Sequence, residues 1–241
     1  LVNKLRAQDG LYALRIAGAR GVEWQVPGAL WQTSVATTER PSVLNAIAAQ
    51  STRWITLTVT EKGYTPALAQ LLIDGLSLRH AAGHAGLTIA SCDNLQGNGH
   101  KLKALIHATA TTEDTALMQW MDASCAFPCS MVDRIVPAAT AEIAEAAKTA
   151  LGLEDDCALS TETFWEWVIE DHFVDPADAA SLAKCGVRVT SKVHSYEEAK
   201  LRMLNGSHSA MALMGAITGR AHIADCIGAD HIREFVYRLM S

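Results

Sequence analysis

Two short apolar segments, separated by one helical segment, constrain the fold of this chain most. Residues 54–60 and 87–91 are rich in β-branched side chains and carry no charge, as expected for parallel strands that are buried on both faces. Residues 66–82, between them, have the apolar spacing of a helix. Strands that alternate with helices predict an α/β fold with a Rossmann-like, mostly parallel sheet. In such sheets ligands bind beyond the carboxyl ends of the strands.

The remaining segments extend this pattern along the chain. From Tyr196 onwards the pattern is wholly helical. We therefore expect an α/β domain over residues 1–194 and the start of an all-helical domain over residues 195–241. Further strands are expected at residues 11–16, 22–36, 131–137 and 187–193, and further helices at residues 1–10, 40–50, 98–110, 113–122 and 140–151.

Composition narrows the class of partner. The 241 residues are 49% hydrophobic and 19% charged, with a formal net charge of −6, which is typical of a globular protein. An acidic balance does not favour nucleic acid or an anionic membrane surface. No apolar run approaches the roughly 20 residues of a membrane span, and the N-terminal segment lacks the apolar stretch of a signal peptide. We expect a cytoplasmic protein with a small-molecule partner, present as a monomer or weak homo-oligomer.

The six cysteines and nine histidines are dispersed along the chain. No two cysteines form a CxxC pair, and the segment from Cys125 to Cys129 has the wrong composition for a zinc knuckle. The cysteines are expected to be reduced, buried thiols. The sequence therefore predicts no metal site.

The segment from Lys200 to His208 carries an amine, an amide and an imidazole on one predicted helix. At about 100° per residue, Asn205 lies roughly 140° around the helix from Lys200, and His208 roughly 80°. All three share one side of the helix with apolar residues such as Met211, which suits the wall of a polar pocket. Burial among apolar neighbours favours proton transfer by a lysine amine. The alternative is an amphipathic helix that carries these residues by chance.

Five segments, taken in order, resemble the polyol-specific long-chain dehydrogenases, the family of mannitol dehydrogenase and fructuronate reductase. The resemblance implies hydride transfer between NAD(H) and a secondary alcohol or ketone, without zinc. It also implies that residues 1–194 form a dinucleotide-binding domain and that residues 195–241 begin a substrate-binding domain. The five segments are Thr58–Tyr64 (TVTEKGY), Ser91–Gly99 (SCDNLQGNG), Phe127–Pro137 (FPCSMVDRIVP), Trp167–Asp171 (WVIED) and Lys200–His208 (KLRMLNGSH).

The resemblance assigns the catalytic roles to four residues. Lys200 matches the general acid–base of the family, which exchanges a proton with the substrate oxygen. Asn94 and Asn205 match the two amides that polarise the carbonyl oxygen. His208 matches the residue that positions a substrate hydroxyl or carboxylate. From the residues alone, Asn94 could belong to a strand-end turn, Asn205 to a helix surface and His208 to a protein core.

The resemblance also implies a set of binding residues around the cofactor and substrate. Alternatives remain open, since Asp133 could pair with Arg134, Lys62 could be a solvated loop charge, and residues 97–99 read as an ordinary turn. Segment 167–171, with its Trp and two acids, is expected to be structural. The expected binding residues are Asp133, Val132, Glu61, Lys62, Tyr64 and Asp93.

The chain departs from the family pattern at its start. It contains no GxGxxG turn for a pyrophosphate, and the acidic residue that selects the ribose hydroxyl is not visible either. In the family both precede the position of Leu1, so we expect a longer polypeptide. The sequence therefore does not distinguish NAD from NADP.

Two details favour a uronate substrate. Lys62 gives the sequence EKGY, and a cation beside the pocket suits a substrate carboxylate. Residues 127–140 look closest to fructuronate reductases. We expect interconversion of D-fructuronate and D-mannonate. A mannitol- or arabinitol-type dehydrogenase and a non-catalytic binding relative are the alternatives.

Overall fold

The computed structural model describes residues 1–240 and divides into two compact units, Leu1–Val189 and Thr190–Ser241. The first unit combines strands and helices, whereas the second is helical. The predicted fold class, an α/β part followed by a helical part, is confirmed by this order of elements. The predicted domain boundary after residue 194 stays a prediction.

The first unit alternates strands and helices along most of its length. Its first half contains α1 (Val2–Ala7), β1 (Leu14–Gly18), β2 (Gly21–Gln25), α2 (Arg40–Ala48), β3 (Trp54–Leu57), the 3₁₀ turn η1 (Glu61–Gly63), α3 (Pro66–Ala81) and β4 (Thr88–Ser91). Its second half contains α4 (Asn98–Thr109), η2 (Thr112–Asp114), α5 (Thr115–Ser124), β5 (Ser130–Asp133), α6 (Ala141–Leu151), β6 (Leu159–Glu162), β7 (Glu166–Glu170), α7 (Ala177–Lys184) and β8 (Arg188–Thr190).

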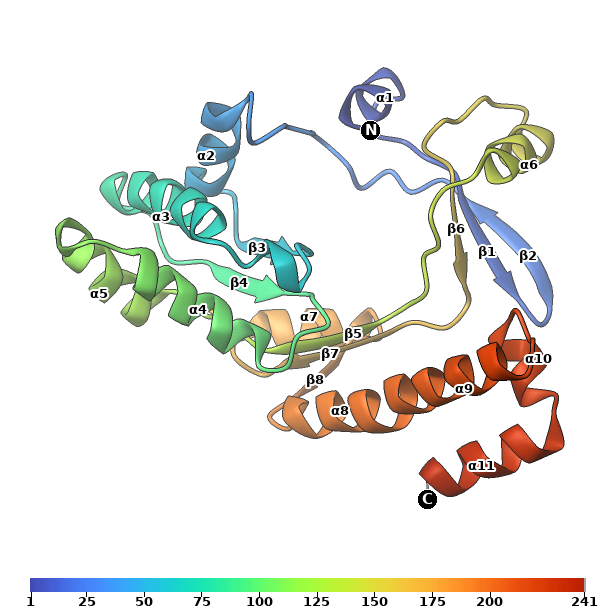
Figure 1. Cartoon of the computed structure of the whole chain (residues 1–241). Helices are drawn as coiled ribbons and strands as arrows, with labels where there is room; N and C mark the ends of the chain where they lie inside the picture. Colours follow the sequence, from blue (N-terminus) through green and yellow to red (C-terminus); the bar gives the residue numbers. More distant parts are fainter. Residues whose placement is uncertain (241) are drawn as a thin grey trace. The chain divides into compact units, whose positions relative to one another are not determined.

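The pair β3–β4 forms the buried centre of the first unit. The two strands are parallel, with Trp54 opposite Thr88 and Leu57 opposite Ser91, as predicted from their apolar runs. In Figure 1, α2, α3, α4 and α5 gather beside this pair. Each large apolar side chain buried here stabilises the fold by roughly 1.5–3 kcal/mol. The fully buried side chains of this core include Leu72, Ile73, Leu76, Leu87, Ile89, Leu102, Ile106 and Met121.

The sheet β2-β1-β6 is mixed, whereas the sequence predicted mostly parallel pairing. β1 and β2 are antiparallel because only Ala19 and Arg20 separate them, and a two-residue connection makes a hairpin. Gly21 has a φ of 120°, which a side chain would strain. β6 then pairs with β1 in parallel. The strand predicted over residues 22–36 ends at Gln25, so most of that prediction was wrong.

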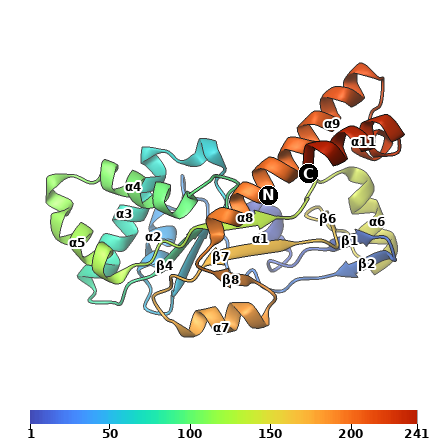
Figure 2. The same ribbon diagram turned by 90° about the horizontal axis from the view of Figure 1, so that it is seen from below.

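The sheet β5-β7-β8 completes the first unit. β5 and β7 are antiparallel, with Ser130 opposite Ile169 and Asp133 opposite Glu166. Helix α7 lies along this sheet in Figure 2, and its Leu182 joins an apolar cluster with Ile169 and other residues of the sheet. The sequence did not predict β6, β7 or α7, because their polar and charged residues obscure the apolar period.

The second unit is helical throughout, as predicted from Tyr196 onwards. Its small core contains Met211, Cys226, Ile232 and Val236. Lys200–Asn205 is a π-helix between two α-helices, a feature that the sequence pattern did not predict. The elements are α8 (Val193–Ala199), the π-helix η3 (Lys200–Asn205), α9 (Gly206–Ile217), α10 (Ile223–Ile227) and α11 (Asp230–Met240).

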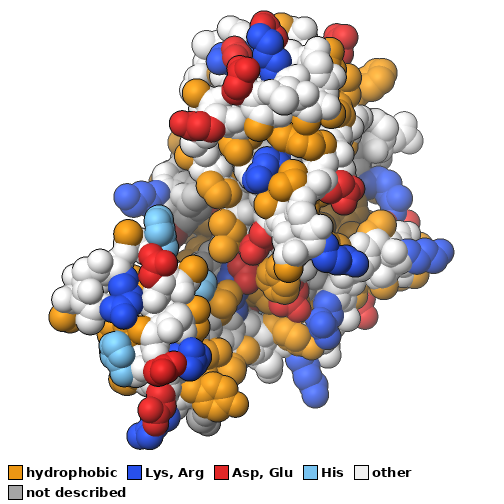
Figure 3. Space-filling view, turned by 90° about the vertical axis from the view of Figure 1, so that its right-hand side faces the viewer, with side chains coloured by type: hydrophobic (Ala, Val, Ile, Leu, Met, Phe, Trp, Pro, Cys, Tyr) orange, Lys and Arg blue, Asp and Glu red, His pale blue; other side chains and the backbone are white. Residues whose placement is uncertain are grey.

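The surface carries charges of both signs. The face drawn in Figure 3 shows basic and acidic side chains interspersed with apolar ones, without a continuous basic stripe. Within residues 1–240, no helix is both long and apolar enough to cross a membrane.

Candidate functional site

The loops that follow β3 and β4 are joined by one carboxylate. Leu57 and Ser91 are paired at the ends of the parallel strands, so the segments that follow them start at the same edge of the sheet. The carboxylate of Asp93 accepts hydrogen bonds from the amides of Thr60 (2.7 Å) and Val59 (3.2 Å) and from the hydroxyl of Ser91 (3.2 Å). Asp93 is 6% exposed. Two of the predicted motifs therefore meet in one buried network.

The backbone is strained where this network holds it. Thr60 has a φ of 61° and a ψ of 170°, a region that is almost restricted to glycine and costs about 1–3 kcal/mol. The turn η1 starts at the next residue, and Glu61 and Lys62 are both exposed on it. Strain of this kind persists only where the surroundings fix it, and it gathers at ligand sites. Asp93 thus fixes the position from which Glu61 and Lys62 project.

Tyr64 extends the same network. Its hydroxyl is hydrogen-bonded to the hydroxyl of Ser91. Burial raises the pKa of Tyr64 to about 12, so the phenol stays protonated at neutral pH. Burial likewise raises the pKa of the Cys92 thiol to about 11, which leaves little thiolate for reaction.

Asn94 and Asn98 have different surroundings although four residues separate them. Asn94 is exposed in the loop that follows β4. Asn98 is fully buried at the start of α4, where its amide donates to the carbonyls of Asp93 (3.0 Å) and Ser130 (2.7 Å). Its side-chain oxygen accepts from the amides of Gly99 (2.8 Å) and Ser130 (2.9 Å). Asn98 and Gly99 therefore begin α4 and brace the loop against β5, whereas Gly97 lies in a turn with a φ of 64°, as the alternative interpretation has it.

The other predicted binding residues lie at the end of β5. Val132 and Asp133 are both partly buried, and they pair with Trp167 and Glu166 of β7. The guanidinium of Arg134 donates to the backbone carbonyl of Glu162 at 3.3 Å.

The predicted structural segment 167–171 packs beside β5. The carboxylate of Glu170 accepts a 3.0 Å hydrogen bond from the amide of Cys129, as a structural acid would. Asp171 is exposed. The indole N–H of Trp167 is buried and has no hydrogen-bond partner within the described part of the chain.

Lys200, Asn205 and His208 lie on one continuous helical rod in the second unit, and all three are partly buried. The predicted angles assumed α-helical geometry, and that assumption was wrong for residues 200–205. A π-helix bonds residue i to residue i+5, so the residue five positions on lies about one turn above. Lys200 and Asn205 are therefore about one turn apart and nearer to one face of the helix than α geometry predicts. π-Turns occur often at functional sites.

These predicted residues belong to two separately described units. The first unit brings together Asp93 and Tyr64, with Glu61 and Lys62 on the loop that Asp93 holds. The second unit brings together Lys200, Asn205 and His208 on one helical rod. Sequence reasoning missed Ser91 and Asn98 as organising residues, although their place at the end of a buried strand was a usable signal.

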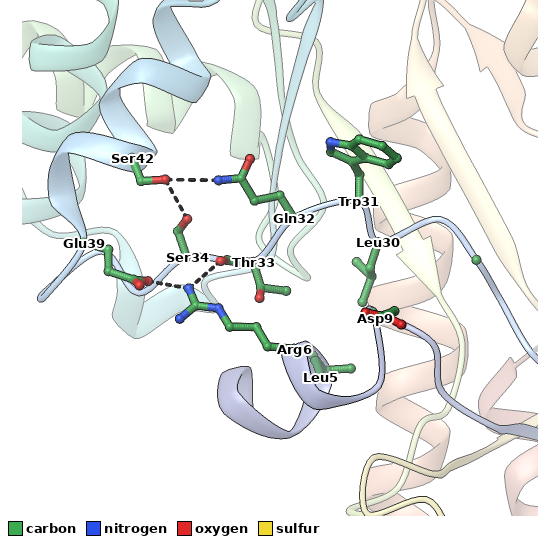
Figure 4. A pocket seen from close by; sticks show the side chains of 12 residues that line it. Leu5, Arg6, Asp9, Leu30, Trp31, Gln32, Thr33, Ser34, Glu39 and Ser42 are labelled. Atoms are coloured by element: carbon green, nitrogen blue, oxygen red, sulfur yellow. Dashed lines mark hydrogen bonds and ion pairs between the residues drawn. The ribbon is translucent and has the colours of Figure 1, made fainter. Parts of the chain in front are cut away.

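One pocket of the first unit lies away from these residues. It has a volume of about 670 Å³, and none of the predicted site residues lines it. Arg6 projects toward it but is paired with Glu39 at 2.6 Å, and Gln32 is hydrogen-bonded to Ser42, as Figure 4 shows. The indole of Trp31 beside it is 98% exposed. Because the guanidinium of Arg6 is already paired with Glu39, Arg6 does not make this pocket an anion site.

Sequence reasoning also missed one group of potential metal ligands. His100, Cys129 and Glu170 lie close together, although they come from three distant parts of the sequence. The only histidines spaced as HxxxH, His80 and His84, flank the end of α3 at Ala81, and His80 stacks on Trp120.

Comparison with known proteins identifies the family. Residues 1–180 match the model of the mannitol dehydrogenase Rossmann domain, and residues 192–241 match that of the mannitol dehydrogenase C-terminal domain. The D-mannonate oxidoreductase of Escherichia coli is 35% identical, over 100% of this chain and 54% of the relative. The mannitol 2-dehydrogenase of Emericella nidulans is 31% identical, over 98% of this chain and 53% of the relative.

A solved structure agrees with the sequence matches. The ternary complex of Pseudomonas fluorescens mannitol 2-dehydrogenase with NAD and D-mannitol superposes with a TM-score of 0.87 at 28% identity, covering 100% of this chain and 54% of that one. The chain thus spans about half the length of the relatives it matches. Both family models together cover nearly all of the sequence, and the chain belongs to the mannitol dehydrogenase family.

Proposed function

We propose that the whole protein is an NAD-dependent oxidoreductase that interconverts D-fructuronate and D-mannonate. The observation that carries the proposal is the π-helix at Lys200–Asn205, which brings these two residues nearer to one face of the helix than α-helical geometry would. A proton donor and an amide donor on one face of a helix suit a single substrate oxygen. The same residues carry the resemblance to the family.

The proposed reaction needs the substrate carbonyl to gain a hydride and a proton. Bound nicotinamide supplies the hydride. Asn94 and Asn205 donate hydrogen bonds to the carbonyl oxygen, so that negative charge developing on it is stabilised. The ammonium of Lys200 then gives its proton to that oxygen, and in the reverse direction the neutral amine removes it. His208 holds a neighbouring hydroxyl or the carboxylate. The amides and the ammonium polarise the carbonyl, so no zinc ion is invoked.

The place of the cofactor is proposed at the edge where β3 and β4 end. A fixed, strained loop and a buried polar network follow these strands, which suits a site that must hold a dinucleotide in one position. We propose that Asp93 and Tyr64 shape this edge, and that Glu61, Lys62, Val132 and Asp133 border the nicotinamide or substrate. The NAD named with the Pseudomonas enzyme supports NAD as the cofactor.

The choice of substrate rests on Lys62 and on a relative. Lys62 is exposed on a loop whose backbone Asp93 fixes, so its ammonium can meet a substrate carboxylate. The 35% identical relative from Escherichia coli is a D-mannonate oxidoreductase. A mannitol- or arabinitol-type dehydrogenase is the second candidate, supported by the mannitol 2-dehydrogenases among the relatives. We further propose that the protein acts in the cytoplasm as a monomer or weak homo-oligomer.

A substrate panel tests this proposal on the full-length polypeptide. We expect NADH oxidation with D-fructuronate and NAD reduction with D-mannonate, each with a kcat/KM well above that for D-fructose or D-mannitol. Preference for mannitol would overturn the uronate assignment and keep the reaction class. NADH binding without turnover of any sugar would indicate a non-catalytic relative. The variant Lys62→Gln should raise KM for D-mannonate more than KM for D-mannitol.

A further inference from the structure

Three metal-ligand side chains converge at the edge of the sheet β5-β7-β8. His100 lies in the first turn of α4, Cys129 directly precedes β5, and Glu170 ends β7. One ligand atom from each, an imidazole nitrogen, a thiol sulfur and a carboxylate oxygen, lies within 4.8 Å of the other two. In a tetrahedral zinc site, ligand atoms are roughly 3.3–3.8 Å apart. Small side-chain rotations therefore suffice to close this group around one ion.

The backbone beneath the three side chains is firmly held. Cys129 and Glu170 are joined by two hydrogen bonds, since the amide of Glu170 donates to the Cys129 carbonyl (2.9 Å) and the Glu170 carboxylate accepts from the Cys129 amide (3.0 Å). The fully buried Asn98 joins α4 to Ser130. A side chain at Gly99 would meet the carbonyl oxygen of Phe127 at 2.5 Å, so α4 packs directly on this segment. The three ligand positions are thus preorganised before any ion binds.

The chemistry of this group selects one kind of ion. A thiolate, an imidazole and a carboxylate are the ligand types of zinc sites, whereas Mg²⁺ and Ca²⁺ take oxygen ligands. The thiolate and the carboxylate together neutralise a divalent charge. Cys129 is 6% exposed, whereas His100 is exposed, so an ion can enter from the imidazole side.

We propose that His100, Cys129 and Glu170 bind one Zn²⁺ ion, with water as the fourth ligand. None of these residues is assigned to the proposed reaction, so the site is additional to it. The ion links α4, β5 and β7, the elements that carry Asn98 and Asp133. Because only the folded chain brings the three ligands together, Zn²⁺ stabilises the folded state.

Metal titration of the reduced full-length protein tests the proposal without any activity assay. We expect one equivalent of Zn²⁺ in calorimetry, a midpoint of thermal unfolding that rises with free Zn²⁺, and no rise with Mg²⁺. Co²⁺ in place of Zn²⁺ should give a thiolate-to-metal absorption band. Changing a residue beside a metal ligand costs 10–100-fold in affinity, so loss of a ligand should cost at least about 100-fold.

Conservative variants separate ligation from folding. His100→Gln changes an exposed side chain, and Glu170→Gln keeps an oxygen that can accept from the Cys129 amide. Both should bind Zn²⁺ at least about 100-fold more weakly, and Cys129→Ser should abolish the Co²⁺–thiolate band. His107→Gln on the same helix and the buried Cys157→Ser are matched controls that should bind normally. Absence of Zn²⁺ binding, a Co²⁺ spectrum without the thiolate band, or unchanged affinity in His100→Gln would overturn the site.

Discussion

The carboxylate of Asp93 accepts a 2.7 Å hydrogen bond from the backbone amide of Thr60, the one residue of the EKGY-containing segment with a positive φ. This bond connects the loop after β4 to the loop after β3. A strained threonine and the acid that holds it are therefore a coupled pair, and their coupling can be measured.

The coupling of Thr60 and Asp93 predicts non-additive stabilities. Thr60→Gly should stabilise the protein by about 1 kcal/mol. Relief of backbone strain in the folded state outweighs the extra conformational freedom that glycine gives the unfolded chain. Asp93→Ala should destabilise it by about 1–3 kcal/mol, because the buried amides of Thr60 and Val59 lose their acceptor. In the Asp93→Ala background Thr60→Gly should stabilise less than it does alone, because without Asp93 the loop can relax and little strain is left to relieve. Urea unfolding of all four proteins measures this, and strictly additive values would mean that Asp93 does not hold the strain.

Tyr64 predicts a loss of stability at high pH. Burial raises its pKa to about 12, above the usual value of 10.0, so the folded protein retains a proton that the unfolded chain releases. Its contribution is fully present below about pH 10 and is lost as the pH rises toward 12. Thermal unfolding at several pH values above 9 should show a steeper decline for the native protein than for Tyr64→Phe. Parallel declines would show that Tyr64 titrates normally.

How far the sequence predicts this molecule depends on the segment. β3 and β4 were predicted because an uncharged, β-branched segment is typical of a buried strand, and α3 because its apolar residues have helical spacing. β6 and β7 were missed because residues such as Glu162, Glu166 and Glu170 place charges at strand ends, where the apolar period fails. The segment after Gln25 was mistaken for a strand because many of its residues are apolar, but within residues 1–240 it pairs with no neighbouring strand.

The candidate site, like the fold, was predicted only in part from the sequence. Motif resemblance predicted Asp93 and Tyr64 as site residues, but the hydrogen bonds that join them through Ser91 depend on strand register. The π-turn at Lys200 could not be predicted from apolar spacing, since that spacing does not fix the hydrogen-bond partner of each amide. The group of His100, Cys129 and Glu170 was missed because only the folded chain brings these positions together.

Asn94 and Asn205 are predicted to act on one substrate oxygen in the full-length enzyme. Each Asn→Ala change should lower kcat by about 10²–10³-fold and change KM less, because the donors act mainly on charge that develops in the transition state. The double variant should lose less than the product of the two single effects. Steady-state kinetics of the four enzymes decides this, and an effect confined to KM would show that the amides only hold substrate hydroxyls.

The most direct test of the account is the turnover of Lys200→Ala in the full-length enzyme. As the proposed general acid–base, Lys200 should contribute about 10²–10⁴-fold to kcat. NADH affinity should be unchanged, because the amine acts on the substrate oxygen, and added small amines should restore part of the rate. We therefore predict a fall in kcat of that size with an unaltered NADH dissociation constant, whereas near-native turnover would contradict the proposed mechanism.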